Sequence, residues 1–452
     1  MALFLSLTAA SFAQEQRILS LEDCIQKGMA NSLPLKIAVE RIRLDEMNLG
    51  VSIRNLFPQI KFHYEGASGS VPAGDWIRKK YSVQGRQPVF HGGELFYSGQ
   101  RDKEILAADA INRLVVEQEI VFNVTEKYYR LLTAQDVEHQ AKTDKKDMED
   151  YFAKIKQGFD KGVMANVDLV GTAFYLKQMR QQYLKYERET QEAEYELKNA
   201  MAMDPHEDIE IVPLPRVLDI TLPPLADCLQ RAFDKRPEMM ALAHELNAKE
   251  YQVKVSRAKD LPSIDMVGNL GRGGEFFKGS DPQNNSDWSL GVEVNWIIGG
   301  NTVSYKFNQD TSTPKINTFD ATKEKQHVAE IGVLDNLKVY GEQQQAKIEE
   351  MEKRNDIDAT MRKIYKETLN AYYQVYAQNK DAALSLAQVA YKKQLHDIAR
   401  FRYQYQEVGA ADVMEKKTEW ALARTQYSQA LGDLAVAAVL LNKAVGESDF
   451  IK

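Results

Sequence analysis

The sequence predicts a mostly helical protein with a β-barrel contribution, built from two related halves. Three observations support this fold class. Landmark residues recur in the same order in each half, long segments of each half lack proline, and shorter segments between them alternate apolar and polar residues. Each half is therefore expected to contain helices, a β-hairpin and a very long helical hairpin.

Composition excludes several classes of protein. The chain has 452 residues, of which 44% are hydrophobic and 27% charged, so it can bury a core. The net charge of −7 argues against nucleic-acid binding. Two cysteines exclude a disulfide scaffold and most cysteine-based metal sites. No apolar run reaches the roughly 18 residues of a transmembrane helix, so membrane crossing would require a β-barrel.

The first 13 residues resemble a targeting segment. They are apolar and then small, and Ser11, Phe12 and Ala13 fit a cleavage site with small residues at its first and third positions. Residues 1–13 are therefore predicted to be a signal peptide, although the usual positive region is missing. Gln14 would begin the exported chain, and no cysteine follows to carry a lipid anchor.

The two halves share recognisable landmarks. Residues 23–26 (DCIQ) recur as 227–230 (DCLQ), and 88–93 (PVFHGG) recur as 295–300 (NWIIGG). This order predicts a duplication. Cys24 and Cys228 occupy matched positions, so each is expected to be a small buried residue of its own repeat rather than half of a disulfide.

The offset between matched residues locates an insertion. It is 204 at Cys24, 207 at Gly93 and 244 at Asp168, so the second half carries 37 extra residues, best placed after Gly300. The predicted organisation is a first repeat at 14–203, a linker at 204–224, a second repeat at 225–446 with the insertion at about 301–337, and a tail at 447–452.

Proline-free segments predict the long helices. Residues 94–159 hold only two glycines and carry an apolar stripe, and a helix of this length would extend about 100 Å. Glycines at 162 and 409 mark sharp turns before returning helices. The predicted helical hairpins span 94–202 and 338–445.

A change of period from 3.6 to 2 predicts four strands. Ile60, Phe62 and Tyr64 alternate with polar residues, and 288–296 alternate most clearly. The two predicted hairpins span about 59–91 and 262–298. A sheet of four strands has two open edges. Such edges aggregate in water and leave unpaired backbone groups in lipid, so other copies of the chain are expected to pair with them.

These residues resemble the TolC-type outer-membrane efflux proteins. The resemblance rests on a strand start at 57–60 (FPQI), a strand exit at 87–93 (QPVFHGG) and a turn at 162–169 (GVMANVDL). It implies a homotrimer with four strands per chain, forming a 12-stranded barrel in the outer-membrane lipid of a Gram-negative bacterium. The barrel would continue into a periplasmic α-helical barrel. The implied function is an exit duct of a tripartite efflux or type I secretion system, fed by an inner-membrane transporter through a periplasmic adaptor.

Two features depart from the family pattern. Gln406 stands where the first half has Gly162, and the insertion at 301–337 has no counterpart in the first half. The insertion is polar and threonine-rich at first, then charged, and its role is left open.

No pattern indicates catalysis. Gly271 to Gly274 lie in a predicted hairpin, so they are not a phosphate loop, and His244-Glu245 lacks the second histidine of a zinc-protease motif. Serine, histidine and aspartate residues are scattered along the chain, and no serine lies in a nucleophile-elbow motif. The sequence therefore predicts no enzymatic activity, no cofactor and no metal site.

The resemblance places adaptor docking at the turns between long helices. Small residues there would allow close backbone approach by a partner. Asp168 and Asp412 also suit helix capping, which is favoured over direct partner contact. The candidate docking residues are Gly162, Val163, Asp168, Gly409, Ala410 and Asp412.

A candidate entrance gate precedes the second turn. Asp397 matches an acidic position that lines the closed entrance in relatives, and three copies would form a carboxylate ring attracting cations. Arg400 is one turn further on and could pair with Asp397 within or between chains. The alternative is an ordinary exposed pair on a helix surface.

Polar residues of the predicted strands are candidates for the barrel lumen. Their charges are mixed, so strong ion selectivity is not expected, and a merely solvated face is the alternative. They are Lys61, His63, Glu65, Arg86, Asp265, Asn269, Glu293 and Asn295.

A competing interpretation is a periplasmic coiled-coil adaptor or scaffold without a barrel. Adaptors carry one helical hairpin, so the duplicated strand pairs count against it. The cargo, whether drugs, metals or protein, stays open. The 14 methionines form no clustered pair in the expected lumen, which disfavours a copper route.

Overall fold

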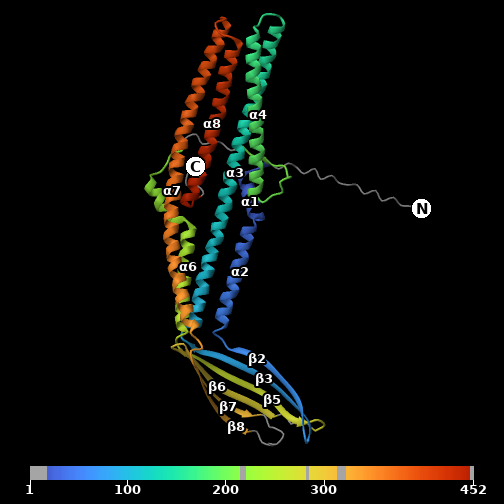
Figure 1. Cartoon of the computed structure of the whole chain (residues 1–452), viewed down its shortest axis with the longest axis vertical. Helices are drawn as coiled ribbons and strands as arrows, with labels where there is room; N and C mark the ends of the chain where they lie inside the picture. The colour runs from blue at the N-terminus through green and yellow to red at the C-terminus, as the bar shows by residue number, and fades with distance from the viewer. Residues whose placement is uncertain (1–17, 214–219, 281–284, 313–321, 448–452) are drawn as a thin grey trace, which may run out of the picture. The chain divides into compact units, whose positions relative to one another are not determined.

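The computed structural model describes residues 18–213, 220–280, 285–312 and 322–447 (Figure 1). The predicted signal peptide at 1–13 and most of the predicted tail lie outside these ranges. In the described ranges, no helix is both long enough and apolar enough to cross a membrane.

Most of the described chain is helical, which confirms the predicted fold class. The two longest helices, α3 and α7, have 67 residues each, because no proline interrupts them. The helices are α1 (Leu21–Asn31), α2 (Leu33–Arg54), α3 (Glu94–Asp160), α4 (Asn166–Ala200), α5 (Leu225–Lys235), α6 (Pro237–Ala258), α7 (Lys338–Gln404) and α8 (Ala410–Val445).

The strands form two sheets. A small parallel pair joins β1 (Ile18–Leu19) to β4 (Glu210–Ile211). The large sheet is antiparallel, with the order β2-β3-β5-β6-β7-β8. Its strands are β2 (Gln59–Val71), β3 (Gly74–His91), β5 (Ser263–Phe277), β6 (Asn285–Ile298), β7 (Asn301–Ser312) and β8 (Thr322–Gly332).

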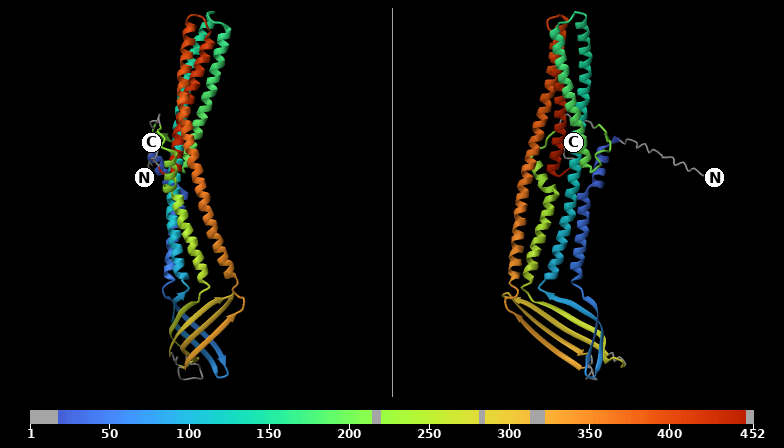
Figure 2. Two further views of the ribbon diagram at one scale, coloured as in Figure 1. Left: turned by 90° about the vertical axis from the view of Figure 1, so that its left-hand side faces the viewer. Right: turned by 45° about the vertical axis from the view of Figure 1, so that its right-hand side comes forward.

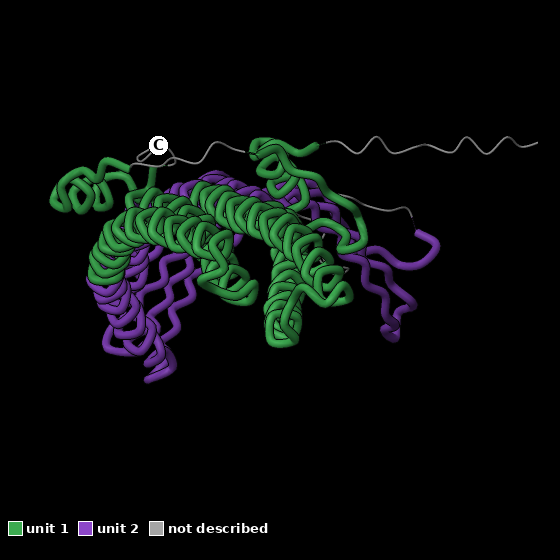
Figure 3. Tube along the Cα trace, turned by 90° about the horizontal axis from the view of Figure 1, so that it is seen from above, with its two compact units in different colours: residues 1–37, 114–237, 361–452 green, residues 38–113, 238–360 purple. Residues whose placement is uncertain are grey.

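The chain forms two compact units, coloured separately in Figure 3. Unit 1 contains residues 1–37, 114–237 and 361–452, and unit 2 contains 38–113 and 238–360. Each unit takes segments from both halves of the sequence. The compact units therefore differ from the two predicted repeats, because matching segments of the two halves pack within the same unit.

Unit 1 contains two related cores. One surrounds Cys24, where α1 packs against α3 and α4, and the other surrounds Cys228, where α5 packs against α7 and α8. Both cysteines are free and fully buried, as the matched positions predicted. In the first core the Tyr128 hydroxyl donates a 2.6 Å hydrogen bond to the Val212 carbonyl, next to the small β1–β4 pair.

Unit 2 contains the large sheet, and Figure 2 shows its strands side by side. The prediction of four strands per chain is wrong, because the sheet has six. The insertion predicted at 301–337 is a third hairpin, β7–β8, which pairs with β6 from Trp288↔Thr311 to Ile298↔Asn301.

The third hairpin begins and ends at neighbouring positions in the fold. Gly299 and Gly300 both have positive φ (61° and 80°) and form the two-residue turn from β6 to β7. After β8, the Asn336 amide donates to the Gly300 carbonyl at 3.1 Å, and α7 begins at Lys338. In the first half, Gly92 and Gly93 also have positive φ, but α3 follows directly at Glu94. The hairpin is therefore an addition that leaves the entry into the long helix in place.

Candidate functional site: sheet faces and helix turns

One face of the large sheet carries apolar side chains on all six strands, although on β8 it also carries Lys323, Lys325 and His327. The strand register sets Phe62, Val83, Leu270 and Trp288 in one row. The third hairpin continues this face with Val303, Tyr305, Phe307 and Ile331. Many of these side chains are exposed, among them Phe62 at 87%, Leu270 at 70% and Ile331 at 71%. A continuous exposed apolar face with aromatic residues suits contact with lipid.

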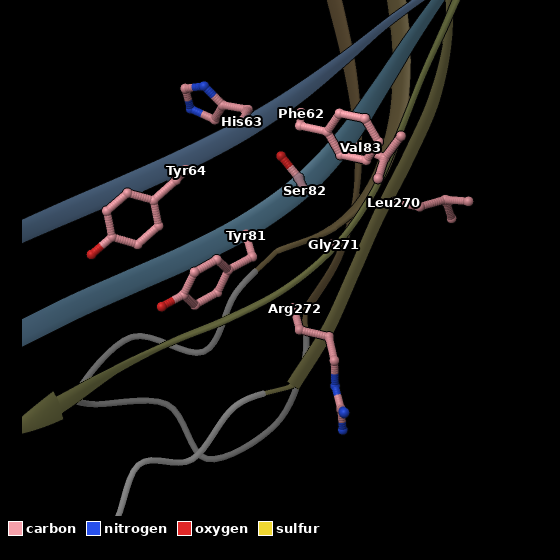
Figure 4. Close-up of a pocket in the computed structure, with 9 residues that line it drawn as sticks. All are labelled: Phe62, His63, Tyr64, Tyr81, Ser82, Val83, Leu270, Gly271 and Arg272. Carbon is pink, nitrogen blue, oxygen red and sulfur yellow. The ribbon is translucent and has the colours of Figure 1, made fainter.

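Figure 4 shows the alternation along the middle of the sheet. His63 leaves β2 on the side opposite to Phe62 and Tyr64. The rings of Tyr64 and Tyr81 lie 4.9 Å apart on the apolar face. The shallow groove at this place is lined by three consecutive residues from each of β2, β3 and β5 and is open to the surface.

The opposite face is polar and carries every predicted lumen residue. The register places Lys61 beside Gln84 and Asn269, and Asp265 beside Glu293. By the same alternation, the other predicted residues share this face. They are His63, Glu65, Arg86 and Asn295.

A network of charges lies on the polar face near the helix-connected ends of the strands. The Arg86 guanidinium contacts Asp265 at 2.7 Å and Glu293 at 3.0 Å. His91 Nε2 lies 2.9 Å from the other Asp265 oxygen, and Lys306 of β7 lies 4.0 Å from Glu293. The two carboxylates of the second half are thus balanced by Arg86 of the first half and by Lys306 of the third hairpin.

Sequence reasoning missed the polar residues that the third hairpin adds to this face. They include Lys306, Asn308, Gln326 and Glu330. A signal existed, because Gly299-Gly300 is followed by the alternation of Val303, Tyr305 and Phe307.

At the far ends of the long helices in unit 1, the two turns are joined by Asp168. Its carboxylate, on the first turn of α4, accepts a hydrogen bond from the Ala411 amide at the start of α8, at 3.2 Å. Asp412 accepts from the Gly409 amide at 3.0 Å and so caps its own helix. Both carboxylates therefore occupy helix N-termini, where the helix dipole favours negative charge.

The four small or apolar turn residues do not all face outward. Ala410 is fully buried, and a Cβ on Gly409 would lie 2.5 Å from the Asp168 carboxylate. Gly409 is partly buried beside Asp168 of α4, and docking of a partner at these two residues stays a prediction. Gly162 has open space around it, and Val163 is 76% exposed.

The predicted gate residues lie about one turn apart on α7. Asp397 is exposed, and one of its carboxylate oxygens lies 3.6 Å from Nδ1 of the adjacent His396. Among the described residues, no ion pair joins Asp397 to Arg400, so the predicted latch does not form within one chain. His396 stacks on Trp420 at 5.5 Å, and burial lowers the pKa of His396 below its usual value.

The described residues contain no group of three or more His, Cys, Asp or Glu side chains arranged to hold a metal ion. The chain matches the family of outer membrane efflux proteins at residues 24–202 and 228–300, which together exceed half of its length. The chain belongs to this family. Family membership places it in the outer membrane of a Gram-negative bacterium with a periplasmic extension, and the family is one of transport channels rather than enzymes.

Individual relatives are distant in sequence. The alkaline protease secretion protein AprF of Pseudomonas aeruginosa is 23% identical over 192 residues. That match spans 41% of this chain and only 40% of AprF. Among solved structures, the outer-membrane channel OprN has a TM-score of 0.73 at 16% identity, covering 94% of this chain and 89% of OprN. The outer membrane protein VceC of Vibrio cholerae has a TM-score of 0.73 at 12% identity, covering 95% and 96%.

These likenesses decide between the two classes considered from sequence. They support an outer-membrane channel of the efflux family over a periplasmic adaptor without a membrane sheet. The identities are low, so the structural matches show the fold and leave cargo and partners to be tested.

Proposed function

We propose that this efflux family member is the outer-membrane exit duct of a tripartite efflux or type I secretion system. It would receive cargo from an inner-membrane transporter through a periplasmic adaptor. The observation that carries the proposal is the division of the six-stranded sheet into two faces. One is mainly apolar from β2 to β7 and reaches Ala329 and Ile331 of β8, and the other is mainly polar. Such a sheet suits a wall with lipid on one side and water on the other.

The duct is proposed to be a homotrimer. The sheet leaves β2 and β8 as edges, and unpaired edges are unfavourable in lipid. A helix of the chain also leaves an apolar stripe uncovered, with Leu44, Met47 and Val51 of α2 between 55% and 68% exposed. Contacts with further copies would bury both features.

The polar face is proposed to line the lumen. Its predicted members carry both signs of charge, and the network of Arg86 with Asp265 and Glu293 neutralises several of them. We therefore expect weak ion selectivity in this part of the duct.

The turns of unit 1 are proposed to form the periplasmic entrance. Gly162 and Val163 would face the adaptor, while Asp168 and Asp412 would hold the two turns in position. Asp397, which is exposed, would form a three-membered carboxylate ring that attracts cations. Arg400 would then be available to a neighbouring chain.

The cargo class is the least constrained part of the proposal. AprF is named for alkaline protease secretion, so protein export is tested alongside small-molecule efflux. An aqueous tube makes few contacts with its cargo, so transport assays with the cognate transporter decide this point.

The first test is detergent extraction from the native outer membrane, followed by sizing and recording in a planar bilayer. The proposal predicts a species of three chains that conducts ions. A species of another size, or one without conductance, would overturn the trimeric duct. In the same recordings, Asp397→Ala should raise conductance or remove block by multivalent cations, and unchanged traces would exclude Asp397 from the gate.

A further inference from the structure

We propose that the third hairpin moves the seam between neighbouring copies, so that β8 of one copy pairs with β2 of the next. Three copies would then close an 18-stranded wall, and the seam would place Glu330 opposite Lys61 or His63. This inference rests on the trimer proposed above, and it names the contact that closes the wall.

The two edges of the sheet are suited to each other. The sheet is antiparallel throughout and has an even number of strands, so β8 and the β2 of a neighbour also run antiparallel. Phe62 and Tyr64 lie on the apolar side of β2. Ile331 and Ala329 lie on the same side of β8 at its helix-connected end, and His327, Lys325 and Lys323 follow them toward the hairpin loop. Joining them would continue each face around the wall.

The tilt of a closed barrel limits the register at this seam. Strands in such barrels tilt by about 35–45° and lie about 4.8 Å apart. Across six strands, this tilt displaces the register by about 20–29 Å, or about six to nine residues. The register gives the direction of this displacement. Phe62 lies three residues from the helix-connected end of β2, but its row reaches β8 at Lys323, nine residues from the helix-connected end there, so the displacement is toward the hairpin loops.

The alternation of side chains between the two faces excludes register displacements by an odd number of residues. The apolar face has even-numbered residues in β2 and odd-numbered residues in β8, because the register links Phe62 through the sheet to Lys323. Only even displacements keep lipid-facing residues together. A displacement of six residues sets Glu330 opposite Lys61 of the neighbouring copy, and a displacement of eight residues sets it opposite His63.

Polar side chains that face each other support either register. Glu330 is exposed on the polar face of β8, and its recorded contact is a 3.5 Å hydrogen bond from the Ser304 hydroxyl. Lys61 and His63 are exposed on the polar face of β2, and no ion pair to either occurs among the described residues. The seam would set the Glu330 carboxylate beside the Lys61 ammonium in one register and beside the His63 imidazole in the other.

An 18-stranded wall has a functional consequence. Barrel diameter grows roughly in proportion to strand number, so the wall would be about 1.5 times as wide as one with 12 strands. The third hairpin would therefore admit bulkier cargo through the membrane section.

Cysteine cross-linking of the full-length chain in outer membranes tests the seam. The double variants Glu330→Cys/Lys61→Cys and Glu330→Cys/His63→Cys are oxidised with copper phenanthroline and run on denaturing gels without reductant. Four strands separate β2 from β8 within a chain, so a disulfide between them must join two copies. One of the two variants should give covalent dimers and trimers in most of the protein.

Two controls make the outcome specific. Glu324→Cys/Lys61→Cys uses the same strand and face but would leave its cysteines six to eight residues out of register, so it should not cross-link. The unmodified chain, with Cys24 and Cys228 buried, measures the background. Cross-linking of the Glu324 variant would overturn the register. Failure of both Glu330 variants in protein that sizes as a trimer would overturn the seam alone, whereas protein that never forms trimers would overturn the proposed duct as well.

A charge swap gives a second readout. Glu330→Lys should reduce the fraction of trimers that resists detergent, and adding Lys61→Glu or His63→Glu should restore it. Equal trimer fractions in all of these variants would contradict the predicted pairing.

Discussion

At the scale of single residues, burial in unit 2 perturbs one carboxyl group of α2. Asp45 is 8% exposed and lies beside the Asp109 carboxyl of α3. Burial and this contact raise the pKa of Asp45 to about 6. Two neighbouring carboxyls that are removed from water favour sharing a proton.

This raised pKa predicts a pH-dependent stability. The folded state keeps the proton between pH 4 and 6, so the stabilisation is present below pH 4 and is lost as pH rises through 6. Asp45→Asn removes the charge and should stabilise unit 2 at pH 8, on the order of 1 kcal/mol, with little effect at pH 4. Thermal unfolding at both values measures this, with the exposed Glu46→Gln as the control. An equal effect of Asp45→Asn at both values would contradict the argument.

The buried thiol of Cys24 allows a second prediction. Burial raises the pKa of Cys24 to about 11, and the neighbouring Asp23 carboxylate adds to the effect. Since the thiolate is the reactive form, Cys24 should resist maleimide at pH 8 in the folded protein and react fully in denaturant. Mass spectrometry of the labelled peptide measures both, and rapid labelling of the folded chain would show that the core opens.

At the scale of elements, the two helical turns solve one problem with different residues. Gly162 has φ +74° without strain, while Gln406, which occupies the matching position, has φ +59°. A left-handed conformation costs a residue with a Cβ roughly 1–2 kcal/mol. Having Gln406 where the first half has Gly162 therefore imposes a conformational cost on the second turn.

Exchanging the two residue types tests this cost. Gly162→Gln should destabilise the first turn by about 1 kcal/mol, and Gln406→Gly should stabilise the second by less than that, because glycine also gains freedom in the unfolded chain. Hydrogen exchange of amides near each turn reports the change. The two substitutions are expected to change turn stability in opposite directions. A change in the same direction for both would show that side-chain contacts, rather than backbone conformation, determine the stability of the turns.

Element boundaries differ in how well sequence predicts them. The expected bounds of the first hairpin, 59 and 91, coincide with the start of β2 and the end of β3, because the period changes there and Gly92-Gly93 ends the strand. The sequence analysis leaves the role of residues 301–337 open and does not predict the third hairpin, although the polar residues there alternate with Val303, Tyr305 and Phe307. The bond from Ala411 to Asp168 joins residues 243 positions apart, and no local pattern reports such a contact.

At the scale of the whole molecule, the third hairpin is separable from the fold around it. It departs at Gly300 and returns at Asn336, whose amide is 3.1 Å from the Gly300 carbonyl. Removing residues 301–335 and joining Gly300 to Asn336 should therefore keep the start of α7. The edge of the sheet would become β6, which carries the same alternation of faces.

This excision predicts a narrower membrane section. Three copies with four strands each would form a wall about two-thirds as wide as the intact one, because diameter follows strand number. The test adds uncharged polymers of graded size to the external side of single channels and measures the largest that enters. The intact chain should admit polymers about 1.5 times as wide as those admitted by the excised chain. Sizing of both proteins as trimers controls for assembly, and an equal cut-off in two trimeric proteins would show that the third hairpin does not widen the wall.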